Sequence, residues 1–134
     1  MKNLLIGLLT VLSLTLNAQL NEYARAIKVN DSEAFNLLIE NAKEKYPDSY
    51  KMQLFEINTQ AESMAEVLSL FIENKGSEKT FSILIRTWSK EGEYDNNLKV
   101  IESGNLCRMN VNWRMIEFNY RQELKAKNEL IYDL

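Results

Sequence analysis

The chain has 134 residues, 16 basic and 19 acidic side chains and a formal net charge of −3, with no histidine and a single cysteine. A mildly acidic chain has no electrostatic attraction to nucleic acid or to anionic lipid, so both are disfavoured as partners. The lack of histidine excludes Ser-His-Asp and Cys-His catalysis and nearly every zinc or copper site. With Cys107 alone, no intramolecular disulfide can form. An enzyme of this composition would depend on carboxylates, a lysine or tyrosine base, or a metal held by oxygen ligands.

The first 18 residues have the pattern of a secretory signal peptide. Lys2 supplies a positive charge, an uncharged leucine-rich run covers residues 4–16, and Ala18 offers a small residue for cleavage. The apolar run is shorter than the roughly 20 residues that a transmembrane helix needs. We therefore predict export to the periplasm or the medium, cleavage before Gln19, and one domain over residues 19–134.

Helical spacing dominates the rest of the chain. Apolar side chains recur three or four residues apart in segments 35–46, 50–71, 81–88, 94–101 and 109–124, and the last pattern continues to Ile131. Asp31 and Ser32 are suited to cap the first of these helices, and Pro47 ends it. Asn58-Thr59-Gln60 is the expected break in the second segment. The second, third and fourth segments are expected to end near Gly76, Gly92 and Gly104.

Two segments also fit a strand pattern. Apolar residues alternate with polar ones in parts of residues 80–89 and 108–116, so an α+β fold is the alternative. Strand alternation, however, leaves Trp88 or Ile116 on the wrong face, whereas helical spacing uses both. We therefore favour an all-α fold.

Three similar short sequences suggest a helical repeat. The sequences around Ile39, Ile72 and Ile101 align at spacings of 33 and 29 residues, and periods in this range are typical of stacked helical hairpins. Ala42 with Pro47, and Gly92-Glu93-Tyr94, match motif positions of the tetratricopeptide-repeat family, which the chain resembles over roughly residues 20–105. The resemblance implies paired antiparallel helices and a concave groove that binds peptides.

Three basic residues are the candidate binding site. Lys79, Arg86 and Lys90 are spaced by seven and four residues, so they are expected to share one face of the helix over 81–88. The tetratricopeptide resemblance implies that this stripe faces the groove, where it could hold a peptide carboxylate or an acidic segment. The alternative interpretation is an ordinary solvated helix face.

Other chemically notable residues have plainer interpretations. Cys107 is expected to be a small buried residue, the alternative being a reactive thiol or an intermolecular disulfide, with Arg108 able to lower its pKa. The carboxylate pairs Glu40–Glu44 and Glu62–Glu66 lie one helical turn apart and could support acid–base chemistry only if one carboxyl were perturbed.

We therefore predict an all-α stack of about three helical hairpins, with residues 108–134 as a C-terminal capping helix. The expected function is an exported, non-catalytic module that binds a peptide or protein partner, with no cofactor, no metal and no catalytic residue. The alternatives are a small exported α+β enzyme that uses carboxylates, and an effector- or immunity-type interaction protein.

Overall fold

The computed structural model describes residues 19–133 of the chain, so the predicted signal peptide lies outside the described residues. This part of the chain is all-α, as the sequence analysis expects. Its elements are α2 (Glu22–Asn30), α3 (Ser32–Lys45), α4 (Tyr50–Glu73), α5 (Glu78–Trp88), α6 (Tyr94–Ser103), the short 3-10 turn η1 (Leu106–Arg108) and α7 (Trp113–Asp133). None of these helices combines the length and the apolar character that a membrane crossing requires.

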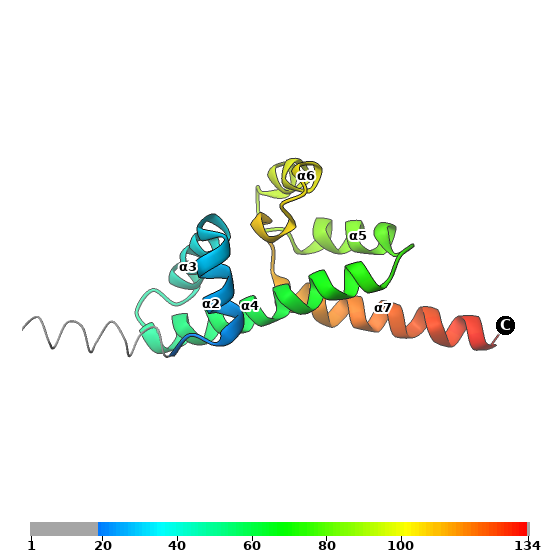
Figure 1. The fold of residues 1–134 in the computed structure, drawn as a ribbon, viewed down its shortest axis with the longest axis horizontal. Coiled ribbons are helices and arrows are strands. Elements are labelled where there is room, and N and C mark those ends of the chain that lie inside the picture. The colour runs from blue at the N-terminus through cyan, green and yellow to red at the C-terminus, as the bar shows by residue number, and fades with distance from the viewer. Residues whose placement is uncertain (1–18, 134) are drawn as a thin grey trace, which may run out of the picture.

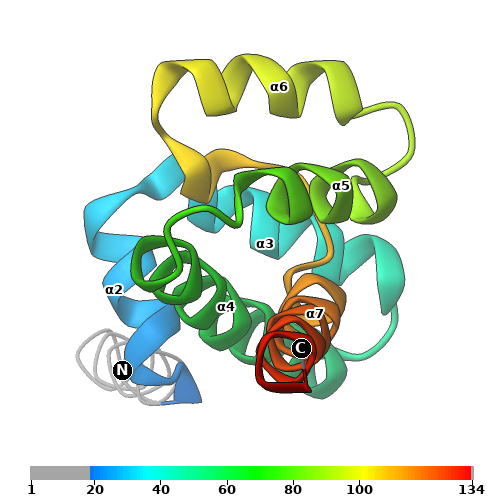
Figure 2. The same cartoon turned by 90° about the vertical axis from the view of Figure 1, so that its right-hand side faces the viewer.

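The long helix α4 is the central helix of the fold (Figure 1). Helices α2 and α3 pack on its N-terminal half, and α7 packs along its C-terminal half. Gln60 contacts Trp113, Ser63 contacts Glu117 and Glu66 contacts Arg121, so the residue numbers rise together and the two helices are parallel. Figure 2 looks along this pair and shows α5 above it, with α6 as an outer layer.

The core lies where α4, α5 and α7 meet. Its largest fully buried apolar side chains are Trp113, Tyr120, Ile85, Met109, Ile116 and Val67. Burying a side chain of this size contributes about 1.5–3 kcal/mol. The rings of Phe71 and Phe81 lie 4.4 Å apart between centroids, and those of Phe81 and Tyr120 lie 5.9 Å apart. The C-terminal helix therefore supplies much of the core as well as the expected cap.

Local signals set several helix ends as predicted. The Asp31 side chain accepts a hydrogen bond from the Ala34 N–H and caps α3, which ends at Lys45, two residues before Pro47. Gly104 ends α6 with a φ of 83°, in the left-handed region that only glycine adopts without strain. Helix α2 is a feature for which the sequence analysis gave no pattern.

The expected break at Asn58-Thr59-Gln60 is wrong, because α4 continues through these residues. The Thr59 hydroxyl bonds to the Phe55 carbonyl within the helix. Asn58 bonds to the backbone of Asn21, and Gln60 bonds to the backbone of Trp113, so their polarity serves tertiary contacts. The middle hairpin of the expected repeat is therefore one continuous helix.

The three aligned isoleucines also differ in environment. Ile39 and Ile101 pack against the core, whereas Ile72 is 72% exposed. A shared position in a repeat would give them similar surroundings. The tetratricopeptide classification stays a prediction.

The expected start of the last helix is also corrected. Residues 109–112 are extended, and α7 begins at Trp113. Val111 forms an isolated antiparallel bridge with Ser89, in which the Lys90 N–H donates to Asn110 (3.0 Å) and the Asn112 N–H donates to Trp88 (2.9 Å). Residues 78–88 are helical, and this bridge is the nearest approach to a sheet within residues 19–133. The α+β alternative is therefore wrong.

Candidate ligand-binding cleft

A cleft of about 470 Å³ opens where this bridge faces the C-terminal part of α3 and the N-terminal half of α4. Two helices line one wall and the bridge lines the other. The lining residues are Leu38, Asn41, Glu44 and Lys45 of α3; Glu56 and Gln60 of α4; Thr87 and Trp88 of α5; and Ser89, Lys90, Asn110, Val111 and Asn112. The volume is in the range of about 300–1,000 Å³ that is typical of ligand pockets.

The bridge wall is held rigidly by one buried side chain of α6. Asn97 is 1% exposed, and its amide nitrogen donates to the Ser89 hydroxyl and to the Asn110 carbonyl. Its amide oxygen accepts the Asn110 N–H at 2.7 Å. Because side chains alternate along extended chain, Asn110 and Asn112 point to the same side, away from that of Val111. The cleft therefore receives two amides from this short segment.

Four primary amides line the cleft, and the amide nitrogens of two of them donate no hydrogen bond. Asn41 donates to the side-chain oxygen of Asn110 at 2.8 Å, and Gln60 donates to that of Asn112 at 3.0 Å. Within the described chain, the Nδ2 groups of Asn110 and Asn112 have no hydrogen-bond partner. No described side-chain nitrogen or oxygen is both enclosed and unpaired, so both Nδ2 groups are open to solvent.

The charges of the cleft are balanced. Lys90 pairs closely with Glu44 and also donates to the Asn41 side chain at 3.1 Å. Lys45 pairs with Glu56 at 3.4 Å. Two cations thus face two anions, so the cleft is neutral; the basic groove expected from the sequence stays a prediction.

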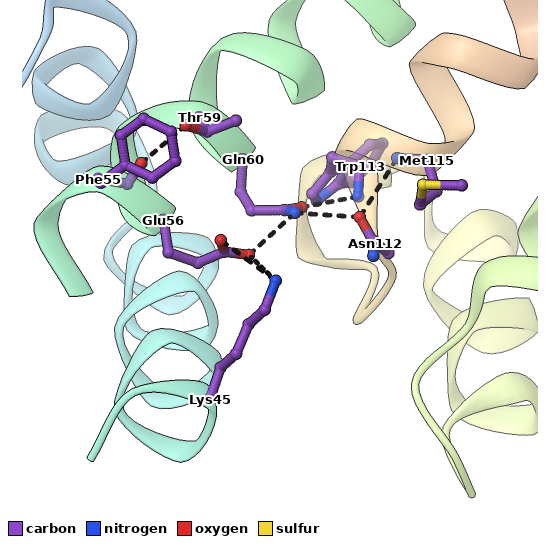
Figure 3. A network of polar contacts seen from close by, with 8 residues as sticks. All are labelled: Lys45, Phe55, Glu56, Thr59, Gln60, Asn112, Trp113 and Met115. Carbon is purple, nitrogen blue, oxygen red and sulfur yellow. Dashed lines mark hydrogen bonds and ion pairs between the residues drawn. The ribbon is translucent and has the colours of Figure 1, made fainter. Parts of the chain in front are cut away.

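Figure 3 shows the polar network at the α4 wall. Gln60 has all its hydrogen-bonding groups engaged: it donates to Glu56 at 3.2 Å and to Asn112, and it accepts the Trp113 N–H at 2.7 Å. Asn112 also caps α7 by accepting the Met115 N–H at 3.2 Å. The network ties α4 to the start of α7 and fixes the orientation of Glu56. Leu38 and the half-buried Trp88 supply the apolar surface.

The three predicted site residues are not brought together. Lys79 is exposed in the first turn of α5, and Arg86 is exposed on the same helix with its guanidinium 5.5 Å from the Tyr94 ring centroid. Neither lines the cleft. Lys90 does, but α5 ends at Trp88, so the bridge positions Lys90 and the expected shared helix face does not extend to it.

The amides and Glu56 were not predicted from the sequence. Asn110-Val111-Asn112 has the polar–apolar–polar alternation that could have indicated an extended segment with two side chains on one face. For Asn41, Glu56 and Gln60 the local sequence carries no such signal, because their partners lie 11–69 residues away.

Cys107 lies outside the cleft, half-buried beside Asp31. Its thiol donates to the Asp31 carboxylate at 3.2 Å, and burial together with this contact raises the thiol pKa to about 11. Arg108 pairs with Asp31 and Glu33, and its opposing effect on the thiol is smaller. Arg108 therefore lowers the pKa of Cys107 as the sequence predicts, but burial and the contact with Asp31 raise it by more.

The residues described here define an all-α domain with a neutral, amide-lined cleft. Among the residues whose side chains the structure describes, no group of three or more histidine, cysteine, aspartate or glutamate side chains is arranged to hold a metal ion. In comparisons with known proteins, no family model, no curated protein and no solved structure matches the chain.

Proposed function

We propose that this chain is a non-catalytic binding module and that its cleft holds an extended peptide segment of a partner. The observation that carries the proposal is the pair of unused amide donors on Asn110 and Asn112, which face a cleft with apolar surface beside them. Primary amides are matched to peptide groups because they both donate and accept hydrogen bonds.

The spacing of the two donors supports an extended ligand. Residues two apart in extended chain are separated by about 6.6 Å along the strand. An extended peptide repeats its same-side carbonyl groups at the same distance, so carbonyls of residues i and i+2 could each accept one Nδ2–H. The side chains of the peptide would stand roughly perpendicular to this row of carbonyls and alternate between its two faces. Leu38 and Trp88 offer apolar contact to side chains that lie along the cleft.

Selection from a random octapeptide library tests this proposal. The purified protein is panned against the library, and affinities of enriched peptides are measured by fluorescence polarisation. The test variant, Asn110→Asp with Asn112→Asp, retains the oxygens that accept from Asn41 and Gln60 but replaces each free donor by a carboxylate oxygen. We expect binding to fall at least about tenfold, because hydrogen bonds of this kind contribute roughly 1 kcal/mol each and the new oxygens repel carbonyls.

A matched control carries the same two charges away from the cleft. Asn36 and Asn105 are both exposed, so Asn36→Asp with Asn105→Asp should bind the selected peptides as the unmodified protein does. Because Asn110 is only 9% exposed, its replacement by a carboxylate should lower stability, so binding is compared at a temperature at which all three proteins are folded. A library that yields no binding peptide, or equal binding by the cleft variant, would refute the proposal.

The proposal includes export, with Gln19 as the first residue of the mature chain, on the strength of the signal-peptide pattern in residues 1–18. Mass spectrometry of the intact protein from periplasmic and medium fractions tests this part. A chain that retains Met1 and stays in the cytoplasm would contradict it.

A further inference from the structure

Glu56 is the least satisfied charged group at the cleft. The residue is 8% exposed and lines the cleft. Its carboxylate receives Lys45 at 3.4 and 3.5 Å and Gln60 at 3.2 Å. Charge-assisted hydrogen bonds are typically about 2.7–2.9 Å long, and an ionised carboxylate has roughly four acceptor positions. A buried carboxylate with three long contacts is therefore short of partners.

Lys45 is a replaceable counter-ion. Its side chain is 53% exposed, and its ammonium also lies 5.5 Å from the centroid of the Tyr46 ring. It can return to solvent without leaving a buried cation behind. Lys90 is different because it contacts Glu44 closely and also bonds to Asn41. Of the two ion pairs at the cleft, the pair at Glu56 is the one that a ligand can open at lower cost.

We propose, building on the proposed function, that the bound peptide places a cationic group at Glu56 and displaces Lys45. An ammonium or guanidinium at normal hydrogen-bond distance would fill the acceptor positions that Lys45 leaves open. Gln60 bonds to both Glu56 and Asn112, so the cation would lie next to the carbonyl held by Asn112. The same chemistry is available from an arginine or lysine side chain and from a free amino terminus.

Synthetic peptide pools distinguish these sources. Four acetylated and amidated nonapeptide pools carry arginine, lysine, citrulline or norleucine at the central position and uncharged mixtures elsewhere. A fifth uncharged pool is compared with a free and with an acetylated amino terminus. Citrulline is the matched neutral form of arginine. We expect at least one cationic form (the arginine pool, the lysine pool or the free amino terminus) to bind at least about tenfold more tightly than its neutral counterpart. The reason is that hydrogen bonds to charged groups are the stronger class.

Two variants separate ligand recognition from a structural role. Glu56→Gln keeps the size and the acceptor for Gln60, and it should remove the preference for the cationic arm while neutral pools bind as before. Lys45→Met removes the competing cation, so the cationic arm should bind several-fold more tightly even though the free protein is less stable. Glu44→Gln is the control, because it removes an exposed cleft carboxylate that is already paired with Lys90.

The outcomes are distinct. A preference for the arginine or lysine pools, or for the free amino terminus, that is lost in Glu56→Gln and enhanced in Lys45→Met supports the inference and identifies the source. Equal binding of charged and neutral arms refutes the inference and leaves the proposed function standing. Weaker cationic binding by Lys45→Met also refutes it. Failure of every pool to bind refutes the inference and the proposed function together.

Discussion

Gln60→Met isolates the contribution of the buried network to stability. Methionine has nearly the volume of glutamine, so the change removes hydrogen bonds without leaving a large cavity. Besides the side-chain oxygen of Asn112, which keeps the Met115 N–H, two groups lose partners: the N–H of Trp113, whose residue is 1% exposed, and the carboxylate of Glu56. An orphaned buried donor costs about 1–3 kcal/mol and a lost hydrogen bond to a charged group about 1.5–3 kcal/mol. We expect a loss of about 4 kcal/mol in the free energy of unfolding.

Urea unfolding followed by circular dichroism measures this loss. With a denaturant slope of about 2 kcal/mol/M, the midpoint should fall by about 2 M while the slope stays unchanged. Gln122→Met, at an exposed position of α7, is the control and should leave the midpoint in place. A loss below about 1 kcal/mol for Gln60→Met would refute the argument, because solvent in the cleft would then satisfy both groups.

Three further predictions concern other contacts. Because the pKa of Cys107 is raised to about 11, iodoacetamide should alkylate its thiol at pH 8 roughly 100-fold more slowly than a free cysteine. The free energy of unfolding should fall as pH rises from 9 to 11. An alkylation rate that reaches its plateau near pH 9 would contradict this. Burial raises the pKa of Asp31, but hydrogen bonds from Ala34 and Arg108 lower it overall. Asp31→Ala should therefore lower the free energy of unfolding by about 1–2 kcal/mol at pH 7, and in urea titrations this loss should shrink as pH falls through the lowered pKa. An equal loss at pH 2 would count against the prediction. Asn97→Ala should lower the free energy of unfolding by about 3 kcal/mol and accelerate hydrogen exchange of the Lys90 and Asn112 amides. Unchanged exchange would show that the bridge does not depend on Asn97.

Local patterns predicted the features that short segments determine. Asp31 and Pro47 bound α3 because a capping side chain and a missing N–H act within a few residues. Apolar spacing identified the buried faces of α5 and α7, including Ile85 and Trp113. The helical content and the C-terminal helix follow from such signals.

The features that failed depend on distant partners. Asn58-Thr59-Gln60 has the composition of a break, yet Asn58 and Gln60 find partners 37 and 52 or 53 residues away, and the helix continues. Helical spacing likewise placed Lys90 on the α5 face. Nothing near Lys90 in the sequence shows that its backbone N–H donates to the carbonyl of Asn110. The cleft is assembled from such long-range contacts, so its amide lining could not be derived from periodicity.

The parallel packing of α4 and α7 also has a consequence for synthesis. Helix α4 is complete at Glu73, whereas α7 begins only at Trp113. At about 5–20 residues per second, a ribosome needs roughly 2–8 s to reach the start of α7. Throughout that interval the nascent chain carries side chains such as Val67 without their final cover. A chaperone that holds unfolded chains therefore has a window of seconds in which to engage this helix before the domain can close.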